Sequence, residues 1–297
     1  MNYLITGGGG FIGNTLAEYL SKNKKNHIII IDLKSKIKNI KNIKYLKGDI
    51  HDYKTFEKIK KKIDIAYHFA AQTSAQIGEE DPKVNFKTNV VGTYNFVTWA
   101  LKNKPKKCYF SSSMAVYGLF CKNVTEGDFC EPVSNYGVSK LMGEMFIKQL
   151  KKKNISFTIL RLFNIYGPGQ DLENLKQGMI SIYLAQVLKN NKIDITGSLD
   201  RTRDFLYIDD LIKILITKKL RKNETYNVGF GKPIKVRRVI ELIEKNLKKK
   251  IATNVREKSE GDIFNSHANI DKLRKLNLVP KINIKKGIKK FLKEIKS

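Results

Sequence analysis

The chain has 297 residues, and its hydrophobic content of 41% is enough to bury one long core or two moderate ones. The formal net charge of +29 raises the question of nucleic acid, but the basic residues are spread along the chain without the interleaved aromatics of single-strand binders, so we expect no nucleic-acid partner. No apolar run could span a membrane, no leader is evident, and three cysteines without metal-ligand spacing suggest neither disulfides nor a metal site, so we expect a cytoplasmic protein without an integral membrane segment.

Apolar runs of strand length alternate with helical patterns through the first half of the chain. The runs cover residues 2–6, 27–32, 43–46, 63–69, 107–112 and 156–162. Residues 85–101 and 135–150 have the apolar spacing of long helices. This alternation is typical of a doubly wound parallel sheet in an α/β fold. Beyond Asn164 the alternation loosens, which indicates a smaller C-terminal domain.

A glycine-rich loop, Thr-Gly-Gly-Gly-Gly-Phe-Ile-Gly at residues 6–13, joins the first strand to the first helix. Glycine permits the tight turn and leaves backbone N–H groups open to a phosphate, while the helix N-terminus adds partial positive charge. Gly7, Gly10 and Gly13 take the three required positions. Such a loop alone is a weak motif, because many turns use glycine for geometry only. Its place between a strand and a helix predicts a pyrophosphate-binding loop.

An acid at the end of the second strand sharpens this prediction. Asp32 lies nineteen residues after Gly13, where a carboxylate accepts hydrogen bonds from the adenosine ribose. Its charge would repel a 2'-phosphate, so it favours NAD over NADP. Lys34 and Lys36 keep NADP open as the alternative.

Tyr136 and Lys140 are four residues apart and therefore lie on one face of the same predicted helix. Alone this spacing is common and usually marks a surface tyrosine beside a surface lysine. Here it accompanies a dinucleotide loop and the serines Ser111, Ser112 and Ser113 at the end of a predicted strand. That combination favours a catalytic interpretation.

The chain resembles the extended short-chain dehydrogenases/reductases, in the group of NAD-dependent nucleotide-sugar epimerases and dehydratases that includes UDP-glucose 4-epimerase. Matching segments run through nearly the whole chain, at residues 6–13, 48–50, 68–71, 89–93, 111–118, 136–140, 161–164 and 203–205, with Asp209. The resemblance implies a Rossmann domain for NAD at residues 1–164 and 205–228. It implies a smaller substrate-binding domain at residues 165–204 and 229–297.

By this resemblance Tyr136 is the catalytic acid/base, Lys140 contacts the nicotinamide ribose and keeps the tyrosine acidic, and Ser113 hydrogen-bonds the reacting oxygen. A free tyrosine titrates near 10, so a base at neutral pH needs a pKa lower by about three units, or roughly 4 kcal/mol. A nearby ammonium and a positive nicotinamide ring can supply this.

The resemblance also implies the cofactor positions. Asp49 and Ile50 would flank the adenine, Ala70 and Ala71 would let the cofactor approach the sheet, and Asn89 would join a structural hydrogen-bond network. The full set of implied cofactor residues is Gly7, Gly10, Phe11, Ile12, Gly13, Asp32, Asp49, Ile50, Ala70, Ala71, Asn89, Tyr136 and Lys140.

The expected reaction is 4-epimerisation of a UDP-hexose or a UDP-N-acetylhexosamine through a transient 4-keto sugar. Dehydratases of this group carry an Asp-Glu pair after the serine or threonine, whereas this chain has Met114 and Ala115 there. That difference argues against dehydration. A keto-sugar reductase, a dehydratase, an epimerase at another carbon and a non-catalytic cofactor-binding regulator stay open as alternatives.

On the substrate side the resemblance implies that Arg203 binds the diphosphate of a nucleotide sugar and that Asn164 hydrogen-bonds the same region. An independent argument supports Arg203: only eight of the 57 basic residues are arginine, so an arginine marks a need for its planar fork. Arg161 is expected to be structural. Ser74 and Gln76 are expected to face the sugar.

The last substrate loop departs from the family pattern. Ser259 stands two residues before Gly261 where the family usually has arginine, and Arg256 is the nearest replacement. Ser266 falls where some hexose epimerases have a bulky tyrosine, so a small residue there predicts room for an N-acetyl group. Helices 85–101 and 135–150 carry more apolar surface, including Trp99 and Phe146, than one sheet face requires, and in this family they pair across a homodimer.

Overall fold

The structure is a computed structural model that describes residues 1–34, 40–119, 121–176, 178–257 and 263–296. Its contacts divide the chain into two compact units. The first contains Met1–Val116, Ser134–Arg161 and Thr217–Tyr226, and the second contains Tyr117–Val133, Leu162–Ile216 and Asn227–Ser297. These limits differ in detail from the domain boundaries inferred from the sequence, which stay a prediction about function.

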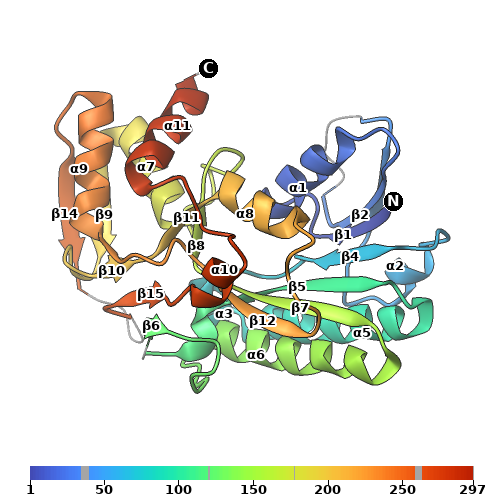
Figure 1. Cartoon of the computed structure of the whole chain (residues 1–297). Coiled ribbons are helices and arrows are strands. Elements are labelled where there is room, and N and C mark those ends of the chain that lie inside the picture. The colour runs from blue at the N-terminus through green and yellow to red at the C-terminus, as the bar shows by residue number, and fades with distance from the viewer. Residues whose placement is uncertain (35–39, 120, 177, 258–262, 297) are drawn as a thin grey trace. The chain divides into compact units, whose positions relative to one another are not determined.

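A seven-stranded sheet in the order β12-β7-β5-β4-β1-β2-β3 forms the centre of the Rossmann fold (Figure 1). Its strands are β1 (Asn2–Thr6), β2 (His27–Asp32), β3 (Ile43–Lys47), β4 (Ile65–His68), β5 (Lys107–Ser113), β7 (Ser156–Leu162) and β12 (Glu224–Val228). The pairs β3·β2, β2·β1, β1·β4 and β4·β5 are parallel. The strand order reverses between β1 and β4, which is where doubly wound sheets bind ligands.

Successive side chains along each strand point to opposite faces of the sheet, and both faces are buried. Leu4, Ile29, Ala66 and Phe110 point to one face and join Phe96 in a single hydrophobic cluster. The neighbouring strand residues are also buried, but on the other face. A strand covered on both sides must be apolar throughout, so these strands appear in the sequence as continuous apolar runs.

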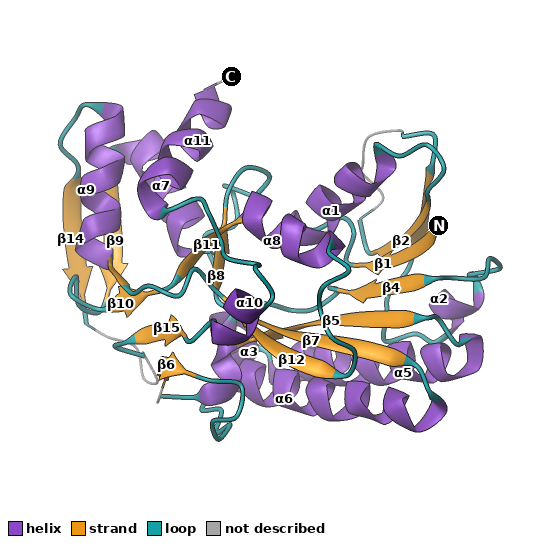
Figure 2. Cartoon of the chain, in the orientation of Figure 1, coloured by secondary structure: helices purple, strands orange, loops and turns teal. Residues whose placement is uncertain are grey.

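Helices flank the sheet on both faces (Figure 2). In the first unit they are α1 (Phe11–Ser21), α2 (Lys54–Glu57), α3 (Ala75–Glu80), α4 (Pro82–Asn85), α5 (Gly92–Asn103) and α6 (Asn135–Lys148), with a 3-10 turn at Gln149–Lys153. A π-helical turn at Phe86–Val91 joins α4 to α5, so the helix expected over residues 85–101 is present and contains a π-helical turn. Such turns often occur at functional sites.

The second unit is built from short strands and helices. Its strands are β6 (Cys121–Val124), β8 (Asn164–Tyr166), β9 (Lys192–Thr196), β10 (Thr202–Arg203), β11 (Phe205–Tyr207), β13 (Ile234–Lys235), β14 (Ala252–Arg256) and β15 (Ser266–Ala268). They pair as β10·β13, β11·β8, β14·β9 and β15·β6. Its helices are α7 (Met179–Asn190), α8 (Ile208–Ile216), α9 (Val236–Leu247), α10 (Asp271–Lys275) and α11 (Ile284–Lys296). A 3-10 turn at Met114–Tyr117 follows β5.

The expected α/β fold with a doubly wound sheet is confirmed, and strands 2–6, 27–32 and 156–162 have the expected limits. The expectation for Trp99 was wrong: its side chain is 2% exposed and packs against Phe56 and Phe96 inside its own unit. Within the described parts of the chain, no helix is both long and apolar enough to cross a bilayer.

Candidate active site

The glycine loop lies where β1 and β4 end side by side. Gly7 has a φ of +72°, and a Cβ at this position would lie 2.5 Å from the backbone nitrogen of Ala70. A Cβ on Gly13 would overlap the carbonyl oxygen of Gly7. A Cβ on Gly10, by contrast, would only make a contact of 3.4 Å with the Gly7 carbonyl oxygen, and Gly10 begins α1 without a side-chain cap. The first N–H groups of α1 can therefore bind a pyrophosphate, and this cradle fits the phosphates of NAD.

Asp32, at the end of β2, contacts the glycine loop through its carboxylate. One carboxylate oxygen accepts a hydrogen bond from the Gly9 N–H at 2.8 Å, and the other accepts one from the Lys34 N–H at 2.9 Å. These contacts hold the carboxylate beside the loop, and its contact with a ribose stays a prediction. Of the two lysines on which the NADP alternative depended, Lys34 is exposed next to this carboxylate and Lys36 lies outside the described residues.

Gly7→Ala is expected to weaken NAD binding at least tenfold, because the added methyl group must push apart the ends of β1 and β4 and a positive φ also strains alanine. The measurement is a titration of the cofactor-free protein with NAD. Gly127→Ala is the matched control, because a Cβ there meets only the Thr125 hydroxyl, at 3.8 Å. Equal affinities in both variants would contradict the close approach seen at Gly7.

Other expected cofactor positions lie around the same strand ends of the first unit. Ile50 is buried, and its carbonyl oxygen accepts from Asn95 Nδ2 at 3.0 Å. Asp49 is half-buried, and His51 Nδ1 lies 2.9 Å from its carboxylate. The Ala70 N–H donates to Thr6 Oγ1 at 3.3 Å. Ala71, next in the chain, is half-buried, and Phe11 and Ile12 form the first turn of α1.

Tyr136, Lys140 and Ser113 come together between α6 and the end of β5. The Tyr136 and Ser113 side chains are hydrogen-bonded, and the Lys140 ammonium lies 5.9 Å from the centre of the Tyr136 ring. Lys140 Nζ donates to the carbonyl oxygen of Ser111 at 2.8 Å. Ser113 Oγ accepts from the Ala115 N–H at 3.2 Å. The structure therefore brings together the three residues that the sequence nominated for catalysis.

Burial controls the protonation of this cluster. It raises the pKa of Tyr136 to about 12, although the hydrogen bond with Ser113 offsets part of the rise. Burial also lowers the pKa of Lys140 to about 7, because the ammonium is shielded from water. Both shifts work against a tyrosinate–ammonium pair, so the isolated cluster is not yet an efficient base. Additional positive charge is needed to lower the tyrosine pKa.

Two contacts that the sequence did not reveal hold the start of α6. Ser134 Oγ caps the helix by accepting from the Gly137 N–H at 3.1 Å. The Glu79 carboxylate accepts from both the backbone N–H and the side-chain amide of Asn135, each at 2.8 Å. Because Tyr136 follows directly, these contacts orient the tyrosine. Glu79 is far away in sequence and belongs to no motif, so pattern reading could not identify it.

Asn89 lies in the π-helical turn and ties several segments together. Its Nδ2 lies 2.9 Å from the Gln72 carbonyl oxygen, 2.8 Å from Asn85 Oδ1 and 3.0 Å from Ser139 Oγ. Its Oδ1 accepts from the Gln72 N–H at 2.8 Å. Ser139 is in α6, so this buried network braces the catalytic helix, as expected for a structural asparagine.

Arg161 forms a buried bidentate pair with Glu144, with Nε–Oε1 and Nη2–Oε2 distances of 2.8 Å. Ser112 Oγ also donates to Glu144, at 2.6 Å. This arrangement joins β7, α6 and β5 and fits the structural role expected for Arg161. Glu144 itself was missed, because no sequence spacing links it to Arg161.

The expected sugar contacts after β4 have local partners. Ser74 Oγ caps α3 by accepting from the Ile77 N–H at 3.3 Å. Gln76 is exposed, and its amide donates to Glu80 at 2.9 Å. Both residues shape the loop before α3, and a sugar contact for either stays a prediction.

In the second unit, a buried carboxylate organises the expected substrate residues. Asp204 accepts from the backbone N–H groups of Phe230 at 2.6 Å, Gly231 at 2.9 Å and Ala268 at 3.1 Å. Burial raises its pKa to about 6, although these hydrogen bonds oppose the rise. Asn164 Nδ2 donates to the Asp204 carbonyl oxygen at 3.0 Å. Asp204 was recognised only as part of a matching segment and not as this organising residue.

Arg203 is 8% exposed, and its guanidinium donates to the carbonyl oxygens of Thr202 at 2.9 Å and Phe264 at 3.4 Å. Ser266 is fully buried, with its hydroxyl 3.5 Å from the Cys121 sulfur. Arg256 is exposed and pairs with Asp194 at 3.1 Å. The positions Ser259 and Gly261, which decide whether Arg256 replaces a family arginine, lie outside the described residues.

Among the described residues, no group of three or more His, Cys, Asp or Glu side chains is placed to hold a metal ion.

Comparison with known proteins agrees with this geometry. A protein of Methanocaldococcus jannaschii, provisionally named UDP-glucose 4-epimerase, is 34% identical over 300 residues, covering 99% of this chain and 98% of its own. The UDP-glucose 4-epimerase of Thermotoga maritima, solved with UDP-glucose, has a TM-score of 0.93 at 27% identity and covers 100% of this chain and 99% of its own. The UDP-N-acetylglucosamine 4-epimerase of Methanobrevibacter ruminantium M1, in complex with UDP-N-acetylmuramic acid, has a TM-score of 0.90 at 28% identity and covers 99% and 98%.

Residues 3–229 match the model of the NAD dependent epimerase/dehydratase family. The matched span contains the glycine loop, Asp32 and the cluster of Ser113, Tyr136 and Lys140. The family resemblance read from the sequence is therefore confirmed, and so is NAD as the cofactor. The chain belongs to the NAD dependent epimerase/dehydratase family and is an NAD-dependent enzyme of the nucleotide-sugar epimerase/dehydratase type.

Proposed function

We propose that this protein is a nucleotide-sugar 4-epimerase that acts on a UDP-hexose or a UDP-N-acetylhexosamine. The observation that carries the proposal is the Ser113–Tyr136–Lys140 cluster, followed by Met114 and Ala115 instead of two acids. The cluster can exchange one proton with a sugar hydroxyl. Without the acid pair, the sequence has no evident acid and base next to Ser113 to drive the loss of water from the sugar.

When bound, NAD would supply a reversible hydride acceptor for C4 of the sugar. Tyr136 receives the proton of the 4-hydroxyl group, and Ser113 hydrogen-bonds the same oxygen. Lys140 would hold the nicotinamide ribose and, when charged, would favour the tyrosinate. Since one pKa unit corresponds to about 1.4 kcal/mol, moving Tyr136 from about 12 toward neutrality requires several kcal/mol, which the charges of Lys140 and the bound cofactor would share.

After oxidation, the resulting 4-keto sugar has to present its other face before Tyr136 returns the proton. Such a cycle consumes no net reductant, which suits a cofactor that stays bound. On the substrate side we propose that Arg203 and Asn164 bind the diphosphate. We assign Ser74, Gln76, Ser266 and Arg256 as candidate sugar or phosphate contacts.

The direct test is to incubate the purified protein with a panel of nucleotide sugars, without added reductant, and to follow the anomeric protons by NMR. Interconversion of C4 epimers is the expected result. A 4-keto-6-deoxy product would identify a dehydratase instead. No change with any sugar would leave a keto-sugar reductase or a regulator, and adding reduced cofactor together with a keto sugar would separate these two.

Ser266 leads to a prediction about substrate choice. Serine is small, whereas some hexose epimerases have a bulky tyrosine at this position. We therefore expect kcat/KM for UDP-N-acetylglucosamine to be within about tenfold of kcat/KM for UDP-glucose, because a pocket with room for the N-acetyl group loses little binding energy with the smaller sugar. The measurement is kcat/KM for both sugars. Ready turnover of UDP-glucose with rejection of the N-acetyl sugar would contradict the assignment of Ser266.

We propose a homodimer that pairs through α5 and α6. Tyr94 is 55% exposed and Met145 is 60% exposed, although both are large apolar residues on helices that also cover the sheet. Tyr94→Asp with Met145→Asp is expected to yield monomers by light scattering at micromolar concentration, whereas Leu188→Asp on α7 should leave the dimer intact. A monomeric wild-type protein would disprove the proposal.

A further inference from the structure

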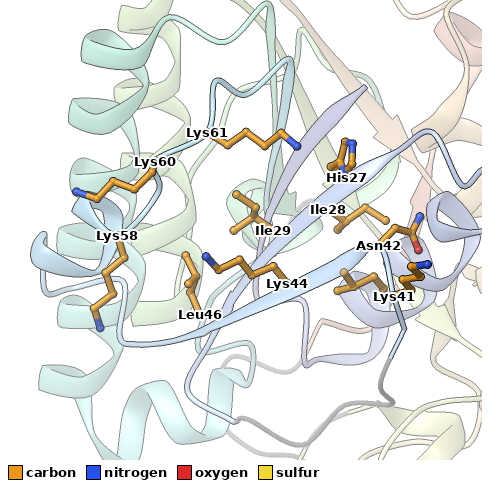
Figure 3. A pocket seen from close by; sticks show the side chains of 11 residues that line it. His27, Ile28, Ile29, Lys41, Asn42, Lys44, Leu46, Lys58, Lys60 and Lys61 are labelled. Carbon is orange, nitrogen blue, oxygen red and sulfur yellow. The ribbon is translucent and has the colours of Figure 1, made fainter.

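A surface cavity of about 260 Å³ lies in the first unit, at the β3 edge of the sheet (Figure 3). None of its lining residues belongs to the glycine loop or to the catalytic cluster, so the proposed reaction does not use it. The residues that line it are His27, Ile28, Ile29, Lys41, Asn42, Ile43, Lys44, Leu46, Lys58, Lys60 and Lys61.

The cavity has an apolar floor that the sheet register explains. Ile29 of β2 is paired with Lys44 of β3, and Leu46, two residues on, points to the same face. Ile29 and Leu46 both pack against the hydrophobic cluster under the sheet. Figure 3 shows Lys44 and Lys61 on either side of Ile29. The two ammonium groups thus border a hydrophobic patch.

The loop after α2 supplies further lysines in a fixed position. Ile59 and Ile63 are 8% and 2% exposed, so they anchor this segment in the core. Their neighbours Lys58, Lys60 and Lys61 are among the lining residues, and Figure 3 shows Lys61 near Ile29, whereas the side chains of Lys58 and Lys60 extend away from it. Because this loop is anchored in the core, its lysines lose less conformational entropy on binding a ligand than lysines of a flexible surface segment would.

The charge of the cavity is one-sided. Lysine makes up 49 of the 297 residues of the chain, but five of the 11 lining residues, and no acid is among them. In the ranges that the structure describes, none of the five ammonium groups forms an ion pair with a carboxylate; Lys58 instead donates to the Lys47 carbonyl oxygen at 3.4 Å. Neighbouring cations without counter-charges repel one another, and a multivalent anion would relieve that repulsion.

Lysines on an edge strand also hinder unwanted strand pairing. That explanation suits Lys44, which is in β3. It does not account for Lys61, which comes from the loop after α2 and borders the same apolar floor. A ligand site accounts for both lysines.

We propose that this cavity binds the diphosphate group of a small anion, with Lys44 and Lys61 as its main contacts and Ile29 and Leu46 beneath any uncharged part. Free pyrophosphate and a nucleoside diphosphate share this chemistry. The proposal is independent of the proposed reaction, because it involves a different set of residues.

The test uses the full chain saturated with NAD, so that the glycine loop is already occupied. Isoleucine δ1-methyl NMR spectra are recorded while pyrophosphate or UDP is added. We expect saturable shifts of the Ile29 and Ile43 signals. Lys44→Ala with Lys61→Ala should weaken binding about tenfold or more. Lys151→Ala with Lys152→Ala, which removes the same charge from an exposed turn of the same unit, should leave the affinity unchanged.

If pyrophosphate shifts these signals and UDP does not, the site is supported and the free anion is its ligand. If UDP binds much more tightly than pyrophosphate, the site is also supported and a nucleoside diphosphate is its ligand. Unmoved Ile29 and Ile43 signals overturn the proposal. Equal affinity in the Lys44/Lys61 variant and the wild type also overturns it. If that variant instead self-associates on size exclusion while the wild type binds neither anion, the lysines protect the sheet edge and the proposal is wrong.

Discussion

Tyr136→Phe is expected to lower kcat by about a thousandfold while NAD stays bound. The substitution removes only the hydroxyl group that, in our proposal, exchanges a proton with the sugar. The ring keeps its place next to the Lys140 ammonium, 5.9 Å from the ring centre, so the packing of α6 should persist. The measurement is the rate of sugar interconversion beside the cofactor content of the purified variant.

Two controls separate chemistry from folding in this experiment. The thermal midpoint should stay near that of the wild type, because the variant loses little beyond the hydrogen bond with Ser113. Ser113→Ala should lower kcat less than Tyr136→Phe does, because it removes a hydrogen bond and not the proton acceptor. A Tyr136→Phe protein with activity within tenfold of the wild type would exclude tyrosine as the acid/base.

Lys140→Met is expected to lower kcat about a hundredfold and to weaken NAD binding, because it removes both the contact with the ribose and the charge that favours the tyrosinate. Lys148→Met is the matched control, since Lys148 lies on the same helix but is exposed. Kinetics and NAD titration measure the two effects. If Lys148→Met and Lys140→Met had equal activity, the buried ammonium would have no role in the reaction.

The same substitution should change how stability depends on pH. Burial lowers the pKa of Lys140 from 10.5 to about 7, so between these values the unfolded chain binds more protons than the folded one. The contribution of Lys140 to the free energy of unfolding of the cofactor-free wild type therefore rises from pH 7 to pH 10.5. Lys140→Met lacks this term, so its stability relative to the wild type should be highest near pH 7 and decline as the pH rises. Urea unfolding at several pH values, with Lys148→Met alongside, measures it.

Local sequence was sufficient for much of the cofactor unit. The strands of the sheet are buried on both faces, and such strands appear as unbroken apolar runs whose ends are visible in the sequence. Glycine spacing and an acid at the end of the second strand are also local features. They predicted the loop and its carboxylate before any geometry was known.

Local patterns failed where a residue acts through distant partners. The helix expected over residues 85–101 is present, but its spacing did not reveal the π-helical turn that carries Asn89, nor the buried contacts of Asn89 with Gln72 and Ser139. Trp99 was assigned to an extra apolar face, but it packs in the core of its own unit. Periodicity locates an apolar face and does not identify the surface that covers it.

The sequence by itself determined the fold class and the dinucleotide loop with its preference for NAD, because these depend on residue type and short spacing, and its resemblance to a family indicated the tyrosine, lysine and serine of the candidate catalytic cluster. Only the tertiary structure decided which groups hold them in place. Glu79 fixes the start of α6, Glu144 pairs with Arg161, and Asp204 gathers three backbone N–H groups of the second unit. Hydrogen bonds between residues far apart in the chain require the folded backbone to bring donor and acceptor within about 3 Å, and a linear sequence contains no record of that distance.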